Sequence, residues 1–290
     1  MSNKPAPIPK VHKNCLTKTY CRDDKQNRFP VHENQIPWSK HYPEYDPDDF
    51  TMPHILKGPG WADPNIRVMD VDINFNAVDG KIDRRSHHGI YKLDDEGSPV
   101  NPCGRTGLRG RGTLGKWGPN HAADPVVTRW KRDKHNVVVK DKVTKKPILQ
   151  FVAIVRRDHG DWAIPGGMVD AGESLSITLK REFGEEALNT LEIPEEHKAT
   201  IKQYLDEIFE NGIEIYRGYV DDPRNTDNAW METQVYNFHD DDGRSVGQFR
   251  LHAGDDATGV KWTDIHKDLK LFASHSDFVK KVANYHNAHW

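Results

Sequence analysis

Three carboxylates, Glu182, Glu185 and Glu186, stand close together in a stretch of helix-forming sequence. At roughly 100° per residue they occupy an arc of about 100° on one side of a helix. Carboxylates this close repel each other unless a cation lies on them, and oxygen ligands with open positions for water and phosphate suit Mg²⁺ or Mn²⁺. The alternative for Glu-x-x-Glu-Glu alone is a solvated acidic face with basic partners in Lys180 or Arg181, the latter at i,i+4 from Glu185.

The segment around these carboxylates predicts how they are held. A strand ending in residues 162–167 leads into a tight loop, because glycine and proline end strands and permit sharp turns. A helix is predicted over residues 174–190, with an apolar stripe at spacing four: Leu175, Leu179 and Phe183. Such a stripe packs a helix on a core. Arg181 stands beside the carboxylates, where it can balance their charge and hold Glu173.

The surrounding sequence predicts an α/β domain from about residue 119 to residue 290. β-Branched residues between turn signals predict the following strands: 149–157, 214–220, 232–238 and 259–263. Apolar residues with helical spacing predict two more helices, at residues 195–211 and 276–287.

Residues 1–118 have a different composition. Frequent prolines in the first half prevent long helices, and turn signals such as Asp79-Gly80 separate short candidate strands. Residues 104–118 form a segment rich in glycine and arginine. We therefore predict an irregular, β-rich accessory domain over residues 1–118, ending in this connector.

Two further patterns in the accessory domain could be mistaken for functional sites. Residues 110–115 match G-x-G-x-x-G, but they neither follow a predicted strand nor open a helix, which excludes a dinucleotide fingerprint. Two interpretations of the connector stay open: Arg105, Arg109 or Arg111 approach phosphates, or these arginines pair with acidic residues of the other domain. His87-His88 lack a ligand set at useful spacing and are interpreted as a surface or interface pair.

Composition excludes several classes of protein. The formal net charge of −3, from 41 Lys+Arg and 44 Asp+Glu, argues against a general nucleic-acid binder. Apolar runs are far shorter than the ~20 residues of a membrane span, and the first residues lack the apolar core of a signal peptide. Three cysteines without a C-x-x-C pair argue against a disulfide framework and a zinc ribbon. We expect an intracellular chain without direct membrane insertion.

The loop and helix together resemble the Nudix box, G-x5-E-x7-R-E-U-x-E-E-x-G-U, where U is apolar. Gly167, Glu173 and the run from Arg181 to Glu186 match it. The end departs from it, because Leu188 replaces a glycine and Asn189 replaces the last apolar residue. The resemblance implies an α/β/α Nudix sandwich with a mixed sheet.

The same resemblance implies hydrolysis of a nucleoside diphosphate linked to another moiety. In the family, the carboxylates that match Glu182 and Glu186 bind a divalent metal, as does the carbonyl that matches Gly166. Glu185 is a further ligand or helper. The base that activates water varies within the family, and Asp256, or its neighbour Asp255, is our candidate. The alternative is that both only form an acidic turn before the next strand.

Other segments resemble one Nudix subfamily, and these are residues 104–112, 117–125, 218–230 and 273–275. The subfamily contains the mitochondrial-type ADP-ribose pyrophosphatase of animals and the homologous domain of the melastatin-type TRP channel gated by ADP-ribose. The intact carboxylates resemble the enzyme, whereas residues 28–31 and 83–86 resemble the channel domain. The resemblance implies either Mg²⁺-dependent hydrolysis of ADP-ribose to AMP and ribose 5-phosphate, in mitochondria, or ADP-ribose sensing by a domain attached to a channel, in the cytoplasm.

The resemblance also implies substrate-binding residues, which are Asp124, Gly166, Met168, Asp222, Arg224, Ser274 and His275. Met168 departs from the channel, which has a hydroxyl residue there. Arg224 independently offers a forked donor for phosphate or ribose oxygens, and its alternative is a loop arginine paired with Asp221 or Asp227. Trp162, next to the loop, is our candidate neighbour of the adenine.

Overall fold

The computed structural model describes residues 4–21, 23–157, 160–189, 202–203, 205–243, 251 and 257–290. The chain divides into two compact units. Unit 1 comprises Met1–Ala122, Asp170–Gly172 and Arg217–Thr233, and unit 2 comprises Ala123–Val169, Glu173–Tyr216 and Gln234–Trp290. The chain therefore passes between the units several times rather than once.

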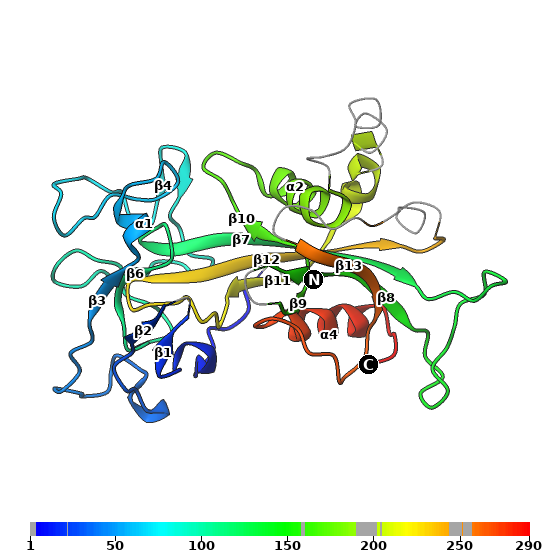
Figure 1. Ribbon diagram of the computed structural model, residues 1–290, viewed down its shortest axis with the longest axis horizontal. Helices are drawn as coiled ribbons and strands as arrows, with labels where there is room; N and C mark the ends of the chain where they lie inside the picture. Colours follow the sequence, from blue (N-terminus) through cyan, green and yellow to red (C-terminus); the bar gives the residue numbers. More distant parts are fainter. Residues whose placement is uncertain are drawn as a thin grey trace. The chain divides into compact units, whose positions relative to one another are not determined.

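One seven-stranded sheet contains the strands of unit 2 (Figure 1). Its order is β11-β12-β7-β8-β13, with β9 paired to β8 and β10 paired to β7. The strands are β7 (Gly118–Trp130), β8 (Leu149–Arg156), β9 (Trp162–Ala163), β10 (Gly167–Met168), β11 (Ile213–Tyr219), β12 (Ala229–Asp240) and β13 (Ala257–Asp264). The short strands β9 and β10 flank the loop before the acidic helix.

The sheet is mixed. Strand β8 is antiparallel to both β7 and β13. At the start of β7, the amide of Gly118 donates to the carbonyl of Asn228, just before β12 (2.8 Å). Further along the same two strands, the side-chain amide of Asn237 donates to the carbonyl of Val126 (2.8 Å). Strands β7 and β12 therefore run in the same direction, and the predicted mixed sheet is confirmed.

Helices cover both faces of this sheet. Helix α2 (Leu175–Leu188) and helix α4 (His275–Tyr285) lie on opposite sides (Figure 1). Successive strand residues point to opposite faces. In β8, Phe151 and Ala153 accordingly join the apolar cluster that contains α4, whereas Val152 joins the cluster that contains α2. The predicted α/β/α arrangement is confirmed.

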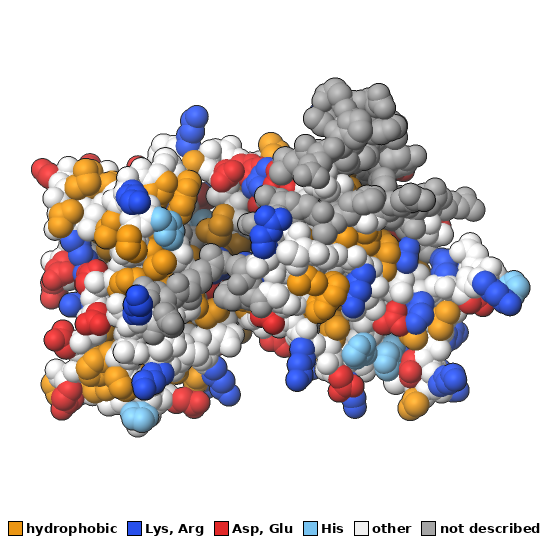
Figure 2. Space-filling view, in the orientation of Figure 1, with side chains coloured by type: hydrophobic (Ala, Val, Ile, Leu, Met, Phe, Trp, Pro, Cys, Tyr) orange, Lys and Arg blue, Asp and Glu red, His pale blue; other side chains and the backbone are white. Residues whose placement is uncertain are grey.

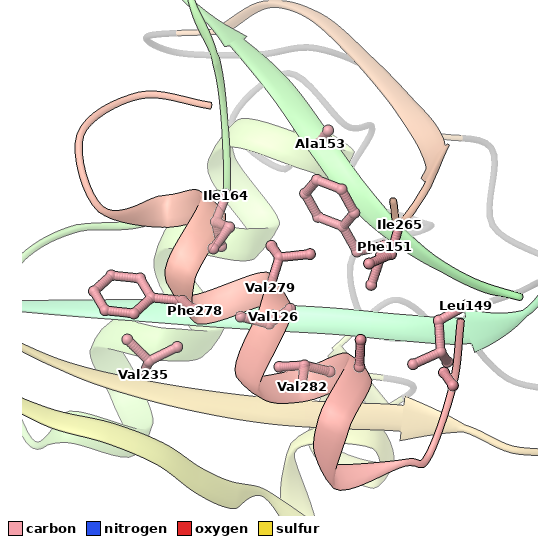
Figure 3. Close-up of a cluster of buried hydrophobic side chains, with 12 residues drawn as sticks. Val126, Leu149, Phe151, Ala153, Ile164, Val235, Ile265, Phe278, Val279 and Val282 are labelled. Atoms are coloured by element: carbon pink, nitrogen blue, oxygen red, sulfur yellow. The ribbon is translucent and has the colours of Figure 1, made fainter. Parts of the chain in front are cut away.

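The core beneath α4 is made of tightly buried aliphatic and aromatic side chains (Figure 3). Phe278, Val279 and Val282 of the helix are at most 2% exposed, and they share the cluster with Val126 and Val235 of the sheet. Burial of one such side chain contributes about 1.5–3 kcal/mol. These contacts fix the position of α4, whose first turn supports the loop described below.

Most predicted elements match the structure. The four predicted strands correspond to β8, β11, β12 and β13, and the predicted helices at 174–190 and 276–287 correspond to α2 and α4. The predicted helix at 195–211 lies partly outside the described residues; within them, residues 202–203 and 205–208 are helical and the 3-10 turn η3 covers Phe209–Asn211. Strand β7 was not predicted, because Pro119 and Pro125 cannot donate to a ladder and argue against a strand.

Unit 1 is irregular and mostly strands, as predicted. Its antiparallel pairs are β1 (Thr19–Tyr20) with β2 (Asp23–Asn27) and β4 (Val78–Asp79) with β5 (Ile82–Asp83), and its parallel pair is β3 (Asp49–Thr51) with β6 (Arg109–Gly112). Helix α1 (Pro53–Leu56) and the 3-10 turns η1 (Lys13–Cys15) and η2 (Glu33–Gln35) complete it. Gly80, with φ of 60°, makes the tight turn between β4 and β5.

Buried arginines organise the loops of unit 1. Arg84 forms a fork with Asp63, with N–O distances of 2.7 and 2.9 Å. Arg105 donates to three backbone carbonyls of residues 35–40 and stacks on three aromatic rings. Arg111 donates to the carbonyls of Asp63 and Gly115. Arg105 and Arg111 therefore hold loops of their own unit by donating to backbone carbonyls.

The described residues include no helix with the length and apolarity that crossing a membrane requires. All three cysteines are free thiols, as the sequence predicts. On the face shown in Figure 2, basic and acidic side chains are interspersed, in keeping with the small net charge.

Candidate metal-binding and hydrolytic site

Helix α2 has well-defined ends. The hydroxyl of Ser174 accepts the amide of Ile177 at the first turn (3.4 Å). The helix ends at Asn189, whose φ of 52° is left-handed and whose amide donates to the carbonyl of Gly184. Asparagine tolerates this conformation better than most residues. Asn189, which departs from the Nudix box, therefore ends the helix. The departure does not change the position of Glu185 and Glu186, which lie about one turn earlier.

The loop between β9 and β10 faces the buried carboxylates of α2. Glu182 is 8% exposed and Glu186 is 5% exposed, one helical turn apart. The amide of Gly166 donates to Oε2 of Glu186 (2.9 Å). A Cβ on Gly167 would clash with the carboxylate of Glu182. The absence of a side chain at Gly167 thus allows the backbone to approach the carboxylate of Glu182 closely.

Asp124, on β7, adds another buried carboxylate. It is 7% exposed, and a Cβ on Gly166 would clash with its Oδ1. Asp124 also acts electrostatically on Glu182. Asp124 was predicted to bind substrate. The structure places it beside the glycine loop and close to Glu182 of α2.

Arg181 links the loop to the helix. It forms a fork with Glu173, with N–O distances of 2.9 and 3.0 Å. It also contacts Glu182 (2.8 Å) and Glu185 (3.2 Å), and it donates to the carbonyl of Met168 (3.2 Å). One guanidinium therefore orients three carboxylates and one strand of the loop.

Burial raises the pKa of Glu182 to about 7. The neighbouring guanidinium of Arg181 lowers this pKa but does not outweigh the burial, and Glu185 and Asp124 raise it further. The site thus holds more negative charge than its surroundings stabilise.

This excess of negative charge fits a hard divalent cation. The donors around the loop are oxygens: carboxylates of Glu182, Glu185 and Glu186, and the carbonyl of Gly166. Such donors suit Mg²⁺ or Mn²⁺ rather than a thiolate- or imidazole-seeking metal. A bound cation would add to the charge compensation that Arg181 provides for Glu182 and Glu185.

The raised pKa of Glu182 predicts a pH-dependent stability in the absence of metal. The folded protein holds this proton up to about pH 7, whereas the unfolded chain releases it near 4.5. The free energy of unfolding therefore falls by about 3 kcal/mol as pH rises through this window. Urea denaturation in EDTA should show this fall for the wild type and a flatter profile for Glu182→Gln. Parallel profiles would contradict the assignment.

The contact between Gly167 and Glu182 predicts a second effect. Gly167→Ala should displace the Glu182 carboxylate and weaken Mn²⁺ binding about 10–100-fold, as the loss of an orienting contact does at other metal sites. Mn²⁺ affinity can be measured by electron paramagnetic resonance. The control is Gly60→Ala, where an added Cβ meets nothing within 4 Å. Equal affinities in the two variants would show that the loop tolerates a Cβ.

Three further predicted substrate residues, His275, Ser274 and Trp162, lie in or next to the segments that adjoin the loop between β9 and β10. Nδ1 of His275 accepts the amide of Ile164 (2.9 Å), so this buried histidine holds the loop from the start of α4. Ser274 is the N-cap residue of α4 and makes no side-chain capping bond. The ring of Trp162 lies 3.9 Å from the ammonium of Lys261. The sequence did not reveal the role of His275, because its partner lies more than a hundred residues away.

The remaining predicted residues do not belong to this part of unit 2. Asp222 and Arg224 lie in unit 1, where Nε and Nη2 of the arginine each contact the carboxylate at 2.8 Å. The partner of Arg224 is thus Asp222 rather than Asp221 or Asp227. Asp255 and Asp256 lie outside the described residues.

Comparison with known proteins identifies matches over nearly the whole chain. Residues 31–118 match the NUDT9-like N-terminal domain, and residues 132–282 match the NUDIX domain. The chain is 51% identical over 280 residues to the mitochondrial ADP-ribose pyrophosphatase of Rattus norvegicus, covering 96% of this chain and 79% of that protein. It is 45% identical over 279 residues to putative nudix hydrolase 6 of Caenorhabditis elegans, covering 96% and 98%. It is 47% identical over 265 residues to transient receptor potential cation channel subfamily M member-like 2 of Nematostella vectensis, covering 90% and 17%.

Proposed function

Because the chain belongs to the Nudix family, we propose that it is a Mg²⁺-dependent ADP-ribose pyrophosphatase that hydrolyses ADP-ribose to AMP and ribose 5-phosphate. The observation that carries this proposal is the intact set of buried carboxylates on α2, faced by the glycine loop. The name of the Rattus norvegicus relative supports ADP-ribose as the substrate.

Glu182, Glu186 and the carbonyl of Gly166, helped by Glu185, would hold the divalent ion. When bound, such an ion neutralises pyrophosphate oxygens and makes a water molecule a better nucleophile. Mg²⁺ is our proposal because every donor is an oxygen, and Mn²⁺ suits the same donors.

The chain's own residues orient this machinery. Arg181 and Glu173 lock the loop to the helix through their fork, so that the carboxylates stay aligned during turnover. Asp256 remains our proposed base for the attacking water. Alignment of this kind contributes to rate because little reorganisation is needed in the transition state.

Substrate contacts are proposed for the residues that match the ADP-ribose sites of the subfamily. Asp124, Met168, Ser274 and His275, all in unit 2, are proposed to contact the substrate, with Trp162 beside the adenine. Asp222 is proposed to orient Arg224, whose Nε and Nη2 it holds, so that Nη1 is directed to a phosphate or ribose oxygen.

A second function is supported by the Nematostella vectensis channel relative. The chain spans 17% of that protein, so an attached channel remains a proposal. In this case the chain would sense ADP-ribose, with hydrolysis secondary or absent. The intact carboxylates favour the hydrolase.

One experiment separates these functions. The 290-residue protein is incubated with ADP-ribose and Mg²⁺, and the products are resolved by chromatography beside an EDTA control. We expect AMP and ribose 5-phosphate in equal amounts with Mg²⁺ and neither with EDTA. Saturable binding of intact ADP-ribose without AMP would support the sensing function instead. Absence of both would point to another diphosphate-linked substrate.

A further inference from the structure

Unit 1 contains a second cluster of residues of the kind that bind metals. His87, His121 and Glu232 each place one ligand atom within 4.8 Å of the others. The three residues come from the loop after β5, from β7 and from β12, so no spacing in the sequence reveals them. The interpretation of His87-His88 as a surface or interface pair therefore missed the other two members.

The hydrogen bonding of His121 leaves one ring nitrogen ready to accept a metal. Its Nε2 lies 3.0 Å from the carbonyl of Arg85. A carbonyl only accepts, so Nε2 carries the proton and Nδ1 keeps its lone pair. Nδ1 is buried and has no hydrogen-bond partner in the part of the chain that the structure describes. Histidines that bind metals usually donate their other nitrogen in this way.

His87 presents a second buried ring nitrogen next to the first. Its Nε2 is also buried without a hydrogen-bond partner among the described residues. The two imidazole rings lie 4.9 Å apart, centroid to centroid. Buried nitrogens without partners are rare in proteins, and two together call for a ligand between them.

Glu232 supplies a fixed negative charge. It is 0% exposed, and its Oε1 accepts from the hydroxyl of Ser86 (2.6 Å) and the indole of Trp230 (2.8 Å). Its Oε2 accepts only the amide of His87 among the described hydrogen bonds (2.7 Å), which leaves a lone pair for one more partner. This carboxylate also offsets the positive charge of Arg217, which acts on His87.

We propose that His87, His121 and Glu232 form a zinc-type metal site in unit 1, with water as the fourth ligand. Two imidazoles and one carboxylate favour Zn²⁺ over Mg²⁺. Zinc bonds of about 2.0–2.1 Å put tetrahedral ligands about 3.4 Å apart, so the three side chains need only a small closure. The metal would tie together three segments of unit 1 that are distant in the sequence.

The test is a zinc titration of the whole chain, stripped of metal and kept in millimolar Mg²⁺ to occupy the carboxylates of α2. We expect one zinc per chain by elemental analysis, and a rise of about 5 °C in Tm at saturating zinc. His121→Ala should lose both the zinc and the Tm shift. His54→Ala, which removes an exposed histidine of the same unit, should keep both. Glu186→Gln should also keep both, which separates this site from the carboxylates of α2.

Three results would overturn the proposal. The first is that the wild type takes up no zinc in Mg²⁺, in which case a water molecule is the ligand of the two nitrogens. The second is equal zinc uptake by wild type and His121→Ala. If His121→Ala fails to fold, His87→Ala serves in its place. The third is that the visible absorption spectrum of the wild type with added Co²⁺ lacks the band typical of four-coordinate cobalt. This measurement does not depend on the folding of any variant.

Discussion

Replacing Glu186 by Gln lowers kcat for ADP-ribose hydrolysis by about 10³-fold, while the protein stays folded. Glutamine keeps the volume and retains an oxygen that accepts the amide of Gly166, so the loop keeps its position. It removes the negative charge that a divalent cation requires. The measurement is steady-state kinetics at saturating Mg²⁺, with the thermal melt of each variant as the test of folding.

Glu210→Gln is the matched control, since Glu210 is exposed on η3 and should be replaceable without effect. The double change Glu185→Ile with Glu186→Lys goes further and should abolish turnover, because it adds a positive charge where the cation binds. If Glu186→Gln turns over at nearly the original rate, the metal lies elsewhere.

Replacing Arg181 by Ala has the second-largest effect, and it acts on both stability and rate. The side chain holds the fork with Glu173 and contacts Glu182 and Glu185. Its loss leaves buried carboxylates facing one another, so in EDTA the free energy of unfolding should fall by about 3 kcal/mol. Because the loop loses its anchor at Met168, kcat/KM should fall about 10²-fold.

Arg181→Lys distinguishes charge from geometry. Lysine keeps the positive charge but cannot form the fork, so it should restore most of the stability and little of the rate. Mg²⁺ should recover more stability in Arg181→Ala than in the wild type, since the cation replaces the missing charge. Urea denaturation with and without Mg²⁺ measures both. If Arg181→Ala is as stable as the wild type in EDTA, the ion pairs are not stabilising.

The part of the site that could be predicted is the part encoded locally. Glu182, Glu186 and their glycine loop belong to one short segment, so helical spacing alone places the carboxylates together. The ends of α2 could also be predicted, because Ser174 and Asn189 have the chemistry of helix caps.

The rest depends on contacts between distant segments. Strand β7 was missed because its prolines argue against a strand, although it runs through the middle of the sheet and carries Asp124. The hydrogen bond from Ile164 to His275 and the cluster of His121 with Glu232 join residues more than a hundred positions apart. Periodicity reports only the local chain, and such pairs become visible only in the folded protein.

The passage of the chain between the two units has a consequence for biosynthesis. A ribosome releases residues 1–118 long before residues 217–233, which belong to the same unit. Those later residues include Asp227, whose carboxylate accepts from Tyr45 and Thr106. Residues 1–118 therefore leave the ribosome before the residues that complete their unit. Unit 1 can finish folding only after residues 217–233 have been synthesised.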